Sequence, residues 1–448
     1  MTTSKAQLIE LPGVTEAITG FVAGMHSNDI PESARRIARL SLLDWMAVAI
    51  AGRNEPVSRI VRELVAEEDG RPDASVFGHP VKLPARAAAL ANGAISHALD
   101  YDDTHFLYLG HPSAAVLPAA LAVAEKNRVN PKDFLDAALI GFEVACRVGA
   151  WLGRRHYQIG FHQTATAGSF GAAMAAARLL KLDKEMTGYA LGLAATRASG
   201  LKAQFGTMGK PYHAGMAASN GVEAALLAAR GFVARPDGLE CAQGFAETHA
   251  GVASDPSLIL DGLGQHFVFE DVQHKFHACC HGTHAALEAL IELRDSHRLD
   301  ANDIASVTIT VHPRYLKVCN ISEPQTALQA KFSYRLTAAL VLAGHDTAAL
   351  TTFSDANCRD RELTVLRDRV TVTTDADMTE TAATVGLEHL SDGAINGYHD
   401  LAAPRSNAVR ETRVRDKAAS LLGRQSADAL WDEINGSNGL LEEWIRRT

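Results

Sequence analysis

The sequence predicts a mainly α-helical protein, with a large all-helical domain formed by both ends of the chain and a smaller inserted α+β domain. Apolar residues recur at helical spacing through most of the first 265 residues. Alternating β-branched residues, which are typical of strands, appear only in the segment 266–400. The helical pattern then returns, so we expect 1–265 and 401–448 to form one domain and 266–400 the insertion.

The helices of the large domain begin at recognisable residues. Proline opens several of the apolar periodic segments, as expected where a backbone N–H is not needed. These segments are Pro31–Ala51, Pro84–Leu99, one that begins at Pro112, and Pro131–Gly153. The region from Thr164 to Arg230 is rich in Ala and Gly, and we expect it to be helical throughout. Its few charged and few bulky residues indicate central helices whose backbones pack closely together.

The inserted domain is predicted from three short patterns. ASVTITVH (Ala305–His312) and RVTVTTDADM (Arg369–Met378) alternate as strands do, and TAATVGLEHL is a third candidate strand. Two helical segments, HAALEALIELRDSHR and SYRLTAALVLAG, lie among them. A compact α+β domain follows from this composition.

Composition limits the class of partner. The 448 residues carry a net charge of -9, and 47% are hydrophobic, which is typical of a protein with a large core. The negative charge gives no reason to expect nucleic acid or an anionic membrane. The first residues lack a secretory signal pattern, and the six cysteines form no disulfide framework. We therefore expect a cytoplasmic protein with reduced thiols.

The stretch from His97 to Pro118 is the first candidate site. It holds three carboxylates and three imidazoles between two apolar helices, and such a loop is costly unless it binds or transforms something. The alternative is a solvated acidic turn that caps the second helix. The groups concerned are His97, Asp100, Asp102, Asp103, Thr104, His105 and His111.

Three later segments supply matching basic groups. GFHQTATAG contains His162, FGTMGKPYHAG contains Lys210, and KFHACCHGTHAALEAL contains Lys275, His281 and His284. His111 and Lys210 each precede a proline that is predicted to begin a helix. A helix N-terminus favours carboxylates and lowers the pKa of a neighbouring basic group, which suits proton transfer. The alternative is that proline starts helices and the preceding residue is incidental.

Other chemistries fit less well. GTMGK lacks the first glycine and the final Ser or Thr of a phosphate-binding loop, and no G-x-G-x-x-G follows a predicted strand. His277, Cys279, Cys280 and His281 resemble metal ligands, but adjacent cysteines rarely bind one ion, and Thr283 is predicted to cap a helix that begins after them. No G-x-S-x-G elbow is present. We expect no metal and no cofactor.

With these residues in view, the sequence resembles the MmgE/PrpD family. The motifs that carry the likeness are HALDYDDTH with GHPSAAVLPA, FHQTATAGSFGAA, TMGKPYHAGMAASNG, KFHACCHGTHAALEA and QAKFSYRLTAAL. The resemblance covers nearly the whole chain. It implies that the α+β domain is a lid, that the protein is a homodimer, and that a cofactor-free active site lies between the domains.

The resemblance also implies positions for the site. Catalytic and substrate-binding positions fall on Asp100, Thr104, His111, His162 and Lys210, and a histidine of the fourth segment, His284 or His281, completes them. We hypothesise that Lys210 and His162 bind carboxylates or exchange protons, that His111 is an acid or base, and that Asp100 with Thr104 orients one of them. Lys275 is a further candidate for substrate binding, whereas Asp102, Asp103 and His105 are assigned to loop structure and capping.

The expected reaction starts at a carbon next to a carboxylate of a small di- or tricarboxylate. A 2-methylcitrate dehydratase-like hydro-lyase is ranked first, an iminodisuccinate epimerase-like isomerase second, and a cis-aconitate decarboxylase-like lyase third. Outside this class, a non-catalytic helical ligand-binding protein and a metal-dependent lyase stay open.

Overall fold

The computed structural model describes residues 13–251, 255–436 and 445–446. Contacts between backbone positions divide the chain into two compact units. Unit 1 comprises Met1–Val272 and Ala429–Thr448, and unit 2 comprises Gln273–Asp428. The units meet in sequence at residue 272, where the expected boundary was 265, and unit 2 extends past residue 400 to include helix α17 (Asn407–Leu422).

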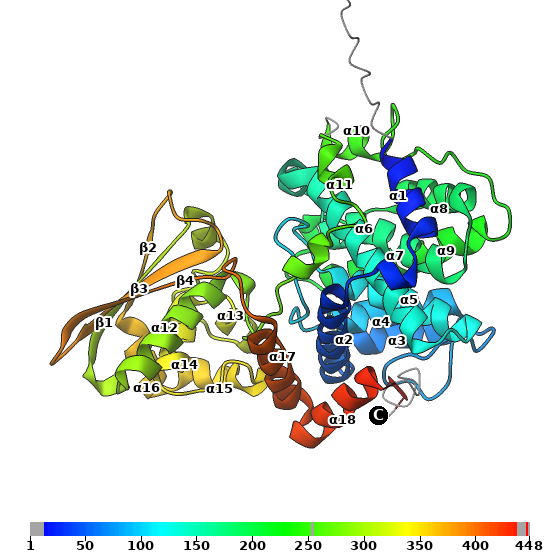
Figure 1. The fold of residues 1–448 in the computed structure, drawn as a ribbon. Coiled ribbons are helices and arrows are strands. Elements are labelled where there is room, and N and C mark those ends of the chain that lie inside the picture. Colours follow the sequence, from blue (N-terminus) through cyan, green and yellow to red (C-terminus); the bar gives the residue numbers. More distant parts are fainter. Residues whose placement is uncertain (1–12, 252–254, 437–444, 447–448) are drawn as a thin grey trace, which may run out of the picture. The chain divides into compact units, whose positions relative to one another are not determined.

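The described part of unit 1 is built from helices (Figure 1). Helices occur in every predicted segment, and each proline-opened helix begins within one residue of its expected start. The helices at 14–24, 56–66, 245–250 and 257–260 were not predicted individually. The longer helices are α1 (Val14–Gly24), α2 (Glu32–Gly52), α3 (Pro56–Ala66), α4 (Ala85–Ser96), α5 (Pro112–Asn127), α6 (Pro131–Gln158), α7 (Gln163–Leu179), α8 (Lys184–Arg197) and α9 (Gly209–Ala228). The shorter ones are α10 (Phe245–Ala250) and α11 (Ser257–Leu260), and α18 (Arg424–Asn435) contains the boundary between the units.

Helix α7 is the centre of unit 1 and packs against α5, α6, α8 and α9 (Figure 1). Its small residues allow this. A Cβ added to Gly171 would lie 2.5 Å from the carbonyl oxygen of Gly141 on α6, so a side chain there would push the helices apart. The prediction of closely packed central helices is confirmed.

The prediction that 164–230 is helical throughout is wrong at two places. Residues 180–183 separate α7 from α8. Residues 198–208 leave the helical conformation between α8 and α9, apart from a short 3-10 turn, η2 (Lys202–Gln204). Within this segment Gly200 has φ 151°, a non-helical conformation that glycine adopts more readily than other residues. Its carbonyl accepts a hydrogen bond from the backbone N–H of His162 (2.9 Å), so this irregular segment lies beside a predicted site residue.

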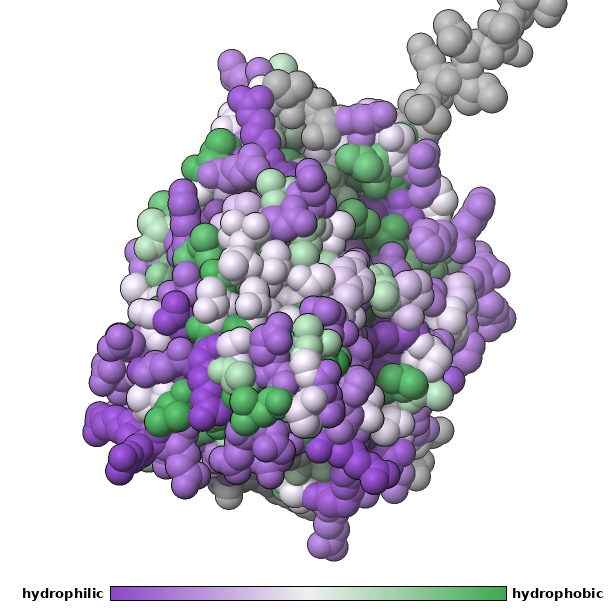
Figure 2. Space-filling view, turned by 90° about the vertical axis from the view of Figure 1, so that its left-hand side faces the viewer, coloured by the Kyte–Doolittle hydropathy of each residue, from purple (hydrophilic) through white to green (hydrophobic). Residues whose placement is uncertain are grey.

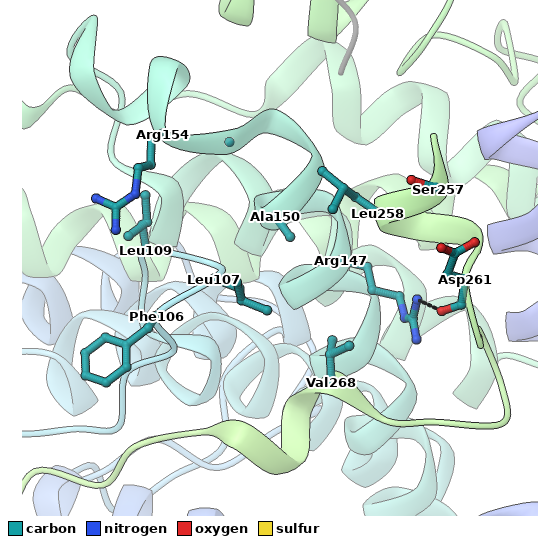
Figure 3. A pocket seen from close by; sticks show the side chains of 11 residues that line it. Phe106, Leu107, Leu109, Arg147, Ala150, Arg154, Ser257, Leu258, Asp261 and Val268 are labelled. Atoms are coloured by element: carbon teal, nitrogen blue, oxygen red, sulfur yellow. Dashed lines mark hydrogen bonds between the residues drawn. The ribbon is translucent and has the colours of Figure 1, made fainter. Parts of the chain in front are cut away.

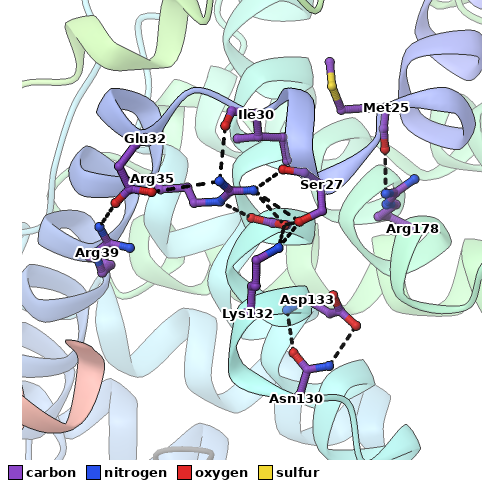
Figure 4. A network of polar contacts seen from close by, with 11 residues as sticks. Met25, Ser27, Ile30, Glu32, Arg35, Arg39, Asn130, Lys132, Asp133 and Arg178 are labelled. Carbon is purple, nitrogen blue, oxygen red and sulfur yellow. Dashed lines mark hydrogen bonds and ion pairs between the residues drawn. The ribbon is translucent and has the colours of Figure 1, made fainter. Parts of the chain in front are cut away.

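A polar network fixes the start of α2 to α6. Nε of Arg35 donates to Oδ1 of Asp136 at 2.7 Å, and the same guanidinium bonds to Ser27 (Figure 4). Lys132 approaches Ser27 from α6. The side chains of Arg35 and Asp136 are only 12% and 4% exposed, so this ion pair is screened less than a surface pair.

Unit 2 contains a four-stranded sheet in the order β2-β1-β3-β4. The strands are β1 (Ile304–Val311), β2 (Val370–Thr374), β3 (Ala382–His389) and β4 (Gly393–Asp400). β1 pairs parallel with β2 and antiparallel with β3, and β3 pairs antiparallel with β4. Helices α12 (His284–His297) and α14 (Tyr334–Leu342) pack against the sheet (Figure 1). Alternate residues of β1, namely Val307, Ile309 and Val311, are therefore buried.

The three predicted strands and two predicted helices of unit 2 are present, and other elements were not expected. β4 reads GAINGYHD and has little β propensity, yet it pairs with β3 along its whole length. Short helices α13 (Ala327–Ala330), α15 (Asp355–Arg359) and α16 (Arg361–Asp368) complete the unit together with α17. The structure thus confirms a mainly α-helical protein with one small sheet.

The face drawn in Figure 2 is mostly polar, with apolar side chains in small groups among polar ones, a common property of water-exposed surfaces. A helix that crosses a bilayer needs about 20 apolar residues. Among the residues described, none of the helices combines that length with that hydropathy.

Candidate active site

The loop between α4 and α5 is held in one shape by its backbone. Asp100 has φ 51°, in the left-handed region that Asp tolerates better than most residues. The N–H of His105 donates to the carbonyl of Gly110 (3.0 Å) and closes a tight turn. A Cβ on Gly110 would lie 2.9 Å from the backbone nitrogen of Thr164, so only glycine lets the loop lie this close to α7.

Asp102 lies between two imidazoles. Its Oδ1 is 2.8 Å from Nδ1 of His97, and its Oδ2 is 3.1 Å from Nδ1 of His111. The side chains of Asp102 and His97 are fully buried. Burial alone raises the pKa of Asp102, but the attraction of the two histidines outweighs it and holds the pKa well below its usual range. Asp102, assigned from the sequence to loop structure, is thus the carboxylate that orients His111.

Asp103 and His105 do have the expected loop roles. The carboxyl group of Asp103 accepts hydrogen bonds from the backbone N–H (3.2 Å) and the hydroxyl (2.6 Å) of Ser113. It thereby pairs a backbone N–H in the first turn of α5 that has no partner within the helix. Burial raises the pKa of Asp103 to about 7. Nε2 of His105 lies 2.8 Å from the carbonyl oxygen of Val268.

Lys210 forms the cationic side of the cluster. Its Nζ lies 2.7 Å from Oδ1 of Asp100, which is in turn 3.5 Å from Nε2 of His111. The side chains of Lys210, Asp100 and His111 are 15%, 38% and 10% exposed, so solvent reaches this face of the cluster. The expected helix start is corrected here: α9 begins at Gly209, so Lys210 lies inside its first turn rather than before it. His111 does directly precede α5.

His162 lies immediately before α7 and joins the same cluster. Its Nδ1 is 3.1 Å from Nδ1 of His213, and its ring centroid is 6.1 Å from that of His97. Phe205 packs edge-on against it at 4.9 Å. The sequence did not single out His213, although it follows Lys210 by three residues on α9 and so shares its face.

The imidazoles of His111 and His162 are held neutral. Burial lowers the pKa of His111 to about 4, although Asp102 opposes this shift. Burial, with the positive charge of Lys210, lowers the pKa of His162 well below its usual value. At neutral pH His111 and His162 are therefore neutral imidazoles beside the ammonium of Lys210, a set of groups suited to binding an anion and exchanging protons.

His97, Asp100, Asp102 and His111 also form a donor set of the kind that binds a cation, with one ligand atom of each within 4.8 Å of the others. The ammonium of Lys210 lies 2.7 Å from Asp100 and already places a positive charge there. The prediction that no metal takes part stays a prediction.

The remaining predicted site residues lie in unit 2, apart from Thr104, which is half-buried in the loop of unit 1. Lys275 and His284 are buried, and His281 is half-exposed. The ring centroid of His284 is 4.8 Å from that of His281 and 4.9 Å from that of His277. Unit 2 thus brings the predicted histidines together, and adds His277 to them.

His277 belongs to a buried ion-pair network. Its Nε2 is 3.3 Å from Oε1 of Glu288, which also contacts Arg413 at 2.6 Å. Burial alone raises the pKa of Glu288, but the hydrogen bond and charge of His277 and Arg413 outweigh it, so the pKa lies well below its usual range. Thr283 precedes α12, but its hydroxyl donates to the carbonyl of Cys280 (2.8 Å) rather than capping the helix as expected.

A separate pocket of about 370 Å³ lies beside the loop in unit 1 and contains none of the predicted site residues (Figure 3). Phe106, Leu107 and Leu109 line it, with Arg147 at its wall. The guanidinium of Arg147 is occupied by Glu143 (2.6 Å) and by backbone carbonyls, among them that of Asp261 (2.8 Å). Arg147 therefore has a structural role.

Comparisons with known proteins identify the family of the chain. The chain matches the profile of the MmgE/PrpD N-terminal domain over residues 16–255 and that of the C-terminal domain over 277–429. The chain belongs to the MmgE/PrpD family.

The similar curated proteins are cis-aconitate decarboxylases or resemble them. A cis-aconitate decarboxylase-like protein, oryM, from Aspergillus oryzae is 32% identical over 63% of this chain and 61% of its own length. Cis-aconitate decarboxylase from Aspergillus terreus is 32% identical over 66% of this chain and 63% of its own, and that from Mus musculus 30% over 63% and 59%. The matched segments span about three fifths of the length of these relatives.

Proposed function

We propose that this protein is a lyase that acts on a small di- or tricarboxylate without a cofactor, and that decarboxylation of cis-aconitate or a close analogue is its reaction. The observation that carries the proposal is the contact between Lys210, Asp100 and His111 beside the buried His162. An ammonium and neutral imidazoles at one partly open face suit a substrate with several carboxylates.

The proposed roles follow from the positions of these groups. Lys210 binds a substrate carboxylate and exchanges its contact with Asp100 for one with the anion. His162 supplies a second polar contact inside the buried part of the cluster. His111, oriented by Asp102, is the acid that delivers a proton to carbon.

The chemistry balances with one proton. The bond to the departing carboxylate breaks as CO2 leaves, and its electron pair shifts into the adjoining conjugated carboxylate system. His111, which takes up a proton from solvent when the bound anion raises its pKa, then delivers that proton to carbon and returns to the neutral imidazole. Burial of the reacting carboxylate favours the loss of CO2, because desolvation destabilises the charged carboxylate but not the neutral CO2.

Decarboxylation is placed ahead of the dehydration that the sequence ranked first. The named activity of the relatives supports it. The 2-methylcitrate dehydratase-like and iminodisuccinate epimerase-like reactions are the alternatives.

Proton NMR of the purified protein with cis-aconitate, 2-methylcitrate and iminodisuccinate tests the proposal. We expect cis-aconitate to be consumed, with one deuterium incorporated per product molecule in D2O. Water loss from 2-methylcitrate alone would overturn decarboxylation in favour of the dehydratase. A protein that neither converts any of the three nor exchanges deuterium into them would be a ligand-binding protein instead.

Two controls complete this test. Activity that survives chelator would exclude a metal-dependent lyase, and loss of activity restored by one divalent metal would contradict the absence of a cofactor. Sedimentation of the same sample tests the further proposal of a homodimer. The cytoplasmic location stays a proposal, which cell fractionation tests.

A further inference from the structure

Unit 2 brings together two thiols that are distant in sequence. Sγ of Cys319 lies 3.2 Å from Sγ of Cys280, 39 residues away along the chain. The six cysteines all lie within the described ranges, and none of them is part of a disulfide. We propose that Cys280 and Cys319 are a redox modification site, joined in a reversible disulfide when a hydroperoxide reaches Cys280.

The backbone holds both cysteines in place. The N–H of Cys280 donates to the carbonyl of Lys331 (3.0 Å), and that of Cys319 to the carbonyl of Tyr315 (2.8 Å). The N–H of Tyr334 donates to the carbonyl of Cys319 (3.1 Å). The sulfurs must approach from 3.2 Å to a bond length of about 2.05 Å. A shift of this size needs only small side-chain rotations, so the fold already supplies the pairing.

Exposure assigns the order of the two thiols. Cys280 is half-buried, whereas Cys319 is fully buried, so oxidant meets Cys280 first. The hydrogen bond to Cys280 and burial raise the pKa of Cys319 well above its usual value, so it stays a thiol until its partner is oxidised. Cys279 is the neighbouring alternative, but it is buried against the hydroxyl of Thr283 (3.0 Å), and burial raises its pKa to about 12.

The chemistry needs one hydroperoxide and no other reactant. The thiolate of Cys280 attacks the peroxide, the O–O bond breaks, and a sulfenic acid forms as water or an alcohol leaves. The sulfur of Cys319 then attacks the sulfenic sulfur, the S–O bond breaks, and its proton leaves with the hydroxide as water. Two thiols are oxidised by two electrons and the peroxide is reduced by two.

The disulfide would tie down a turn that carries a predicted site residue. Cys280 directly precedes η4 (His281–Thr283), and Cys319 follows η6 (Pro313–Lys317). Gly282, the middle residue of η4, has no room for a side chain, because an added Cβ would lie 2.6 Å from the ring of Tyr315. The bond therefore links two segments that are already in contact, at a point adjacent to His281.

Peptide mapping tests the proposal without any measurement of activity. The full-length protein is treated with graded hydrogen peroxide, blocked with iodoacetamide and digested without reductant. We expect a cross-linked pair of peptides that contain Cys280 and Cys319, lighter than the two thiol peptides by two hydrogen atoms and lost on treatment with dithiothreitol. Oxidation of Met208, which is 50% exposed, serves as the internal measure that peroxide acted.

Two variants make the test decisive. With Cys319→Ser we expect Cys280 to pass to the irreversible sulfinic and sulfonic acids at peroxide doses from which the wild type recovers. Cys358→Ser removes another buried thiol of unit 2, and we expect it to keep the cross-link. Oxidised Met208 without a Cys280–Cys319 cross-link would overturn the proposal, as would a cross-link from Cys279 in its place.

Discussion

The carboxylate of Asp102 lies 3.1 Å from Nδ1 of His111 and is fully buried. Because its second oxygen is engaged by His97 at 2.8 Å, the carboxylate cannot turn away from either ring. With Nδ1 of His111 beside Asp102, its Nε2 lies on the side of Asp100 and Lys210, where solvent enters. Asp102 is thus a positioning residue for the proposed proton donor.

Asp102→Asn tests this role. The amide keeps the size of the carboxylate but not its charge, so the orientation and proton affinity of His111 change. We expect kcat to fall by about 10- to 100-fold, the range for removing a group that orients a metal-binding histidine, with a smaller change in KM. The pH profile of kcat should shift as well, which a purely structural role would not produce.

Asp103→Asn is the matched control for this substitution, because Asp103 is buried in the same loop but contacts Ser113. It should retain most of the wild-type kcat. Equal losses in the two variants would mean that the loop as a whole, rather than Asp102, is what the reaction requires.

Lys210→Met removes the ammonium and keeps the length of the side chain. Asp100 then loses its partner at 2.7 Å, and a substrate carboxylate meets a negative charge instead of a positive one. We expect kcat/KM to fall by about 10²–10³-fold, the range for loss of a group that stabilises charge in a partly desolvated site.

Lys202→Met is the control, because Lys202 contacts Tyr157, with Nζ 3.0 Å from its carbonyl oxygen, and is not part of the cluster. Its steady-state kinetics should match the wild type. A folded Lys210→Met protein with unchanged kcat/KM would remove Lys210 from the proposed mechanism.

Candidate site residues could be proposed from the sequence where they lie at the ends of regular elements. His111 directly precedes a helix, and Lys210 lies in a first turn, so motif and helix pattern were enough. The pairing of Asp102 with two histidines was not predictable, because the direction of a side chain in an irregular loop follows from φ values such as that of Asp100, which no periodicity encodes.

For the fold, too, strongly patterned segments were predictable and weakly patterned ones were not. Helices with strong apolar periodicity were predicted to within a few residues, and α6 is broken at Gly153, where its predicted end lay. β4 was missed because its residues have low strand propensity and its pairing with β3 supplies the stabilisation.

The two candidate histidines of unit 2 differ in exposure, so their alanine variants should have different effects. His281 is half-exposed, whereas His284 is 2% exposed and lies against His277. We expect His281→Ala to raise KM at nearly unchanged stability. His284→Ala should instead lower the melting temperature, because removing a buried ring leaves a cavity that costs about 2–5 kcal/mol. A larger effect of His284→Ala on KM than on stability would reverse this assignment.

The raised pKa of Asp103 predicts that the stability of the folded protein depends on pH. Its folded pKa of about 7 exceeds the unfolded value near 4, so the folded protein binds the extra proton between these values. Its contribution to stability is therefore lost as the pH rises from about 4 to 7. Since the amide introduced by Asp103→Asn resembles the protonated acid, the melting temperature of this variant relative to wild type should rise between pH 5 and 8. A difference that stays constant with pH would contradict this.

Binding of a tricarboxylate should take up protons. In the free protein His111 has a pKa of about 4 and is neutral at pH 7. A bound anion raises that pKa, so affinity is gained below the pKa of the complex and lost as the pH rises through it.

Propane-1,2,3-tricarboxylate serves as a probe that cannot lose CO2 by the proposed route, because it has no double bond. Calorimetry in buffers of different ionisation enthalpy should show net uptake of up to about one proton at pH 7. The uptake should be smaller in His111→Gln and unchanged in Lys202→Met. Binding with no net proton uptake by the wild type would show that His111 stays neutral beside the anion, and the proton for carbon would then have to come from another group.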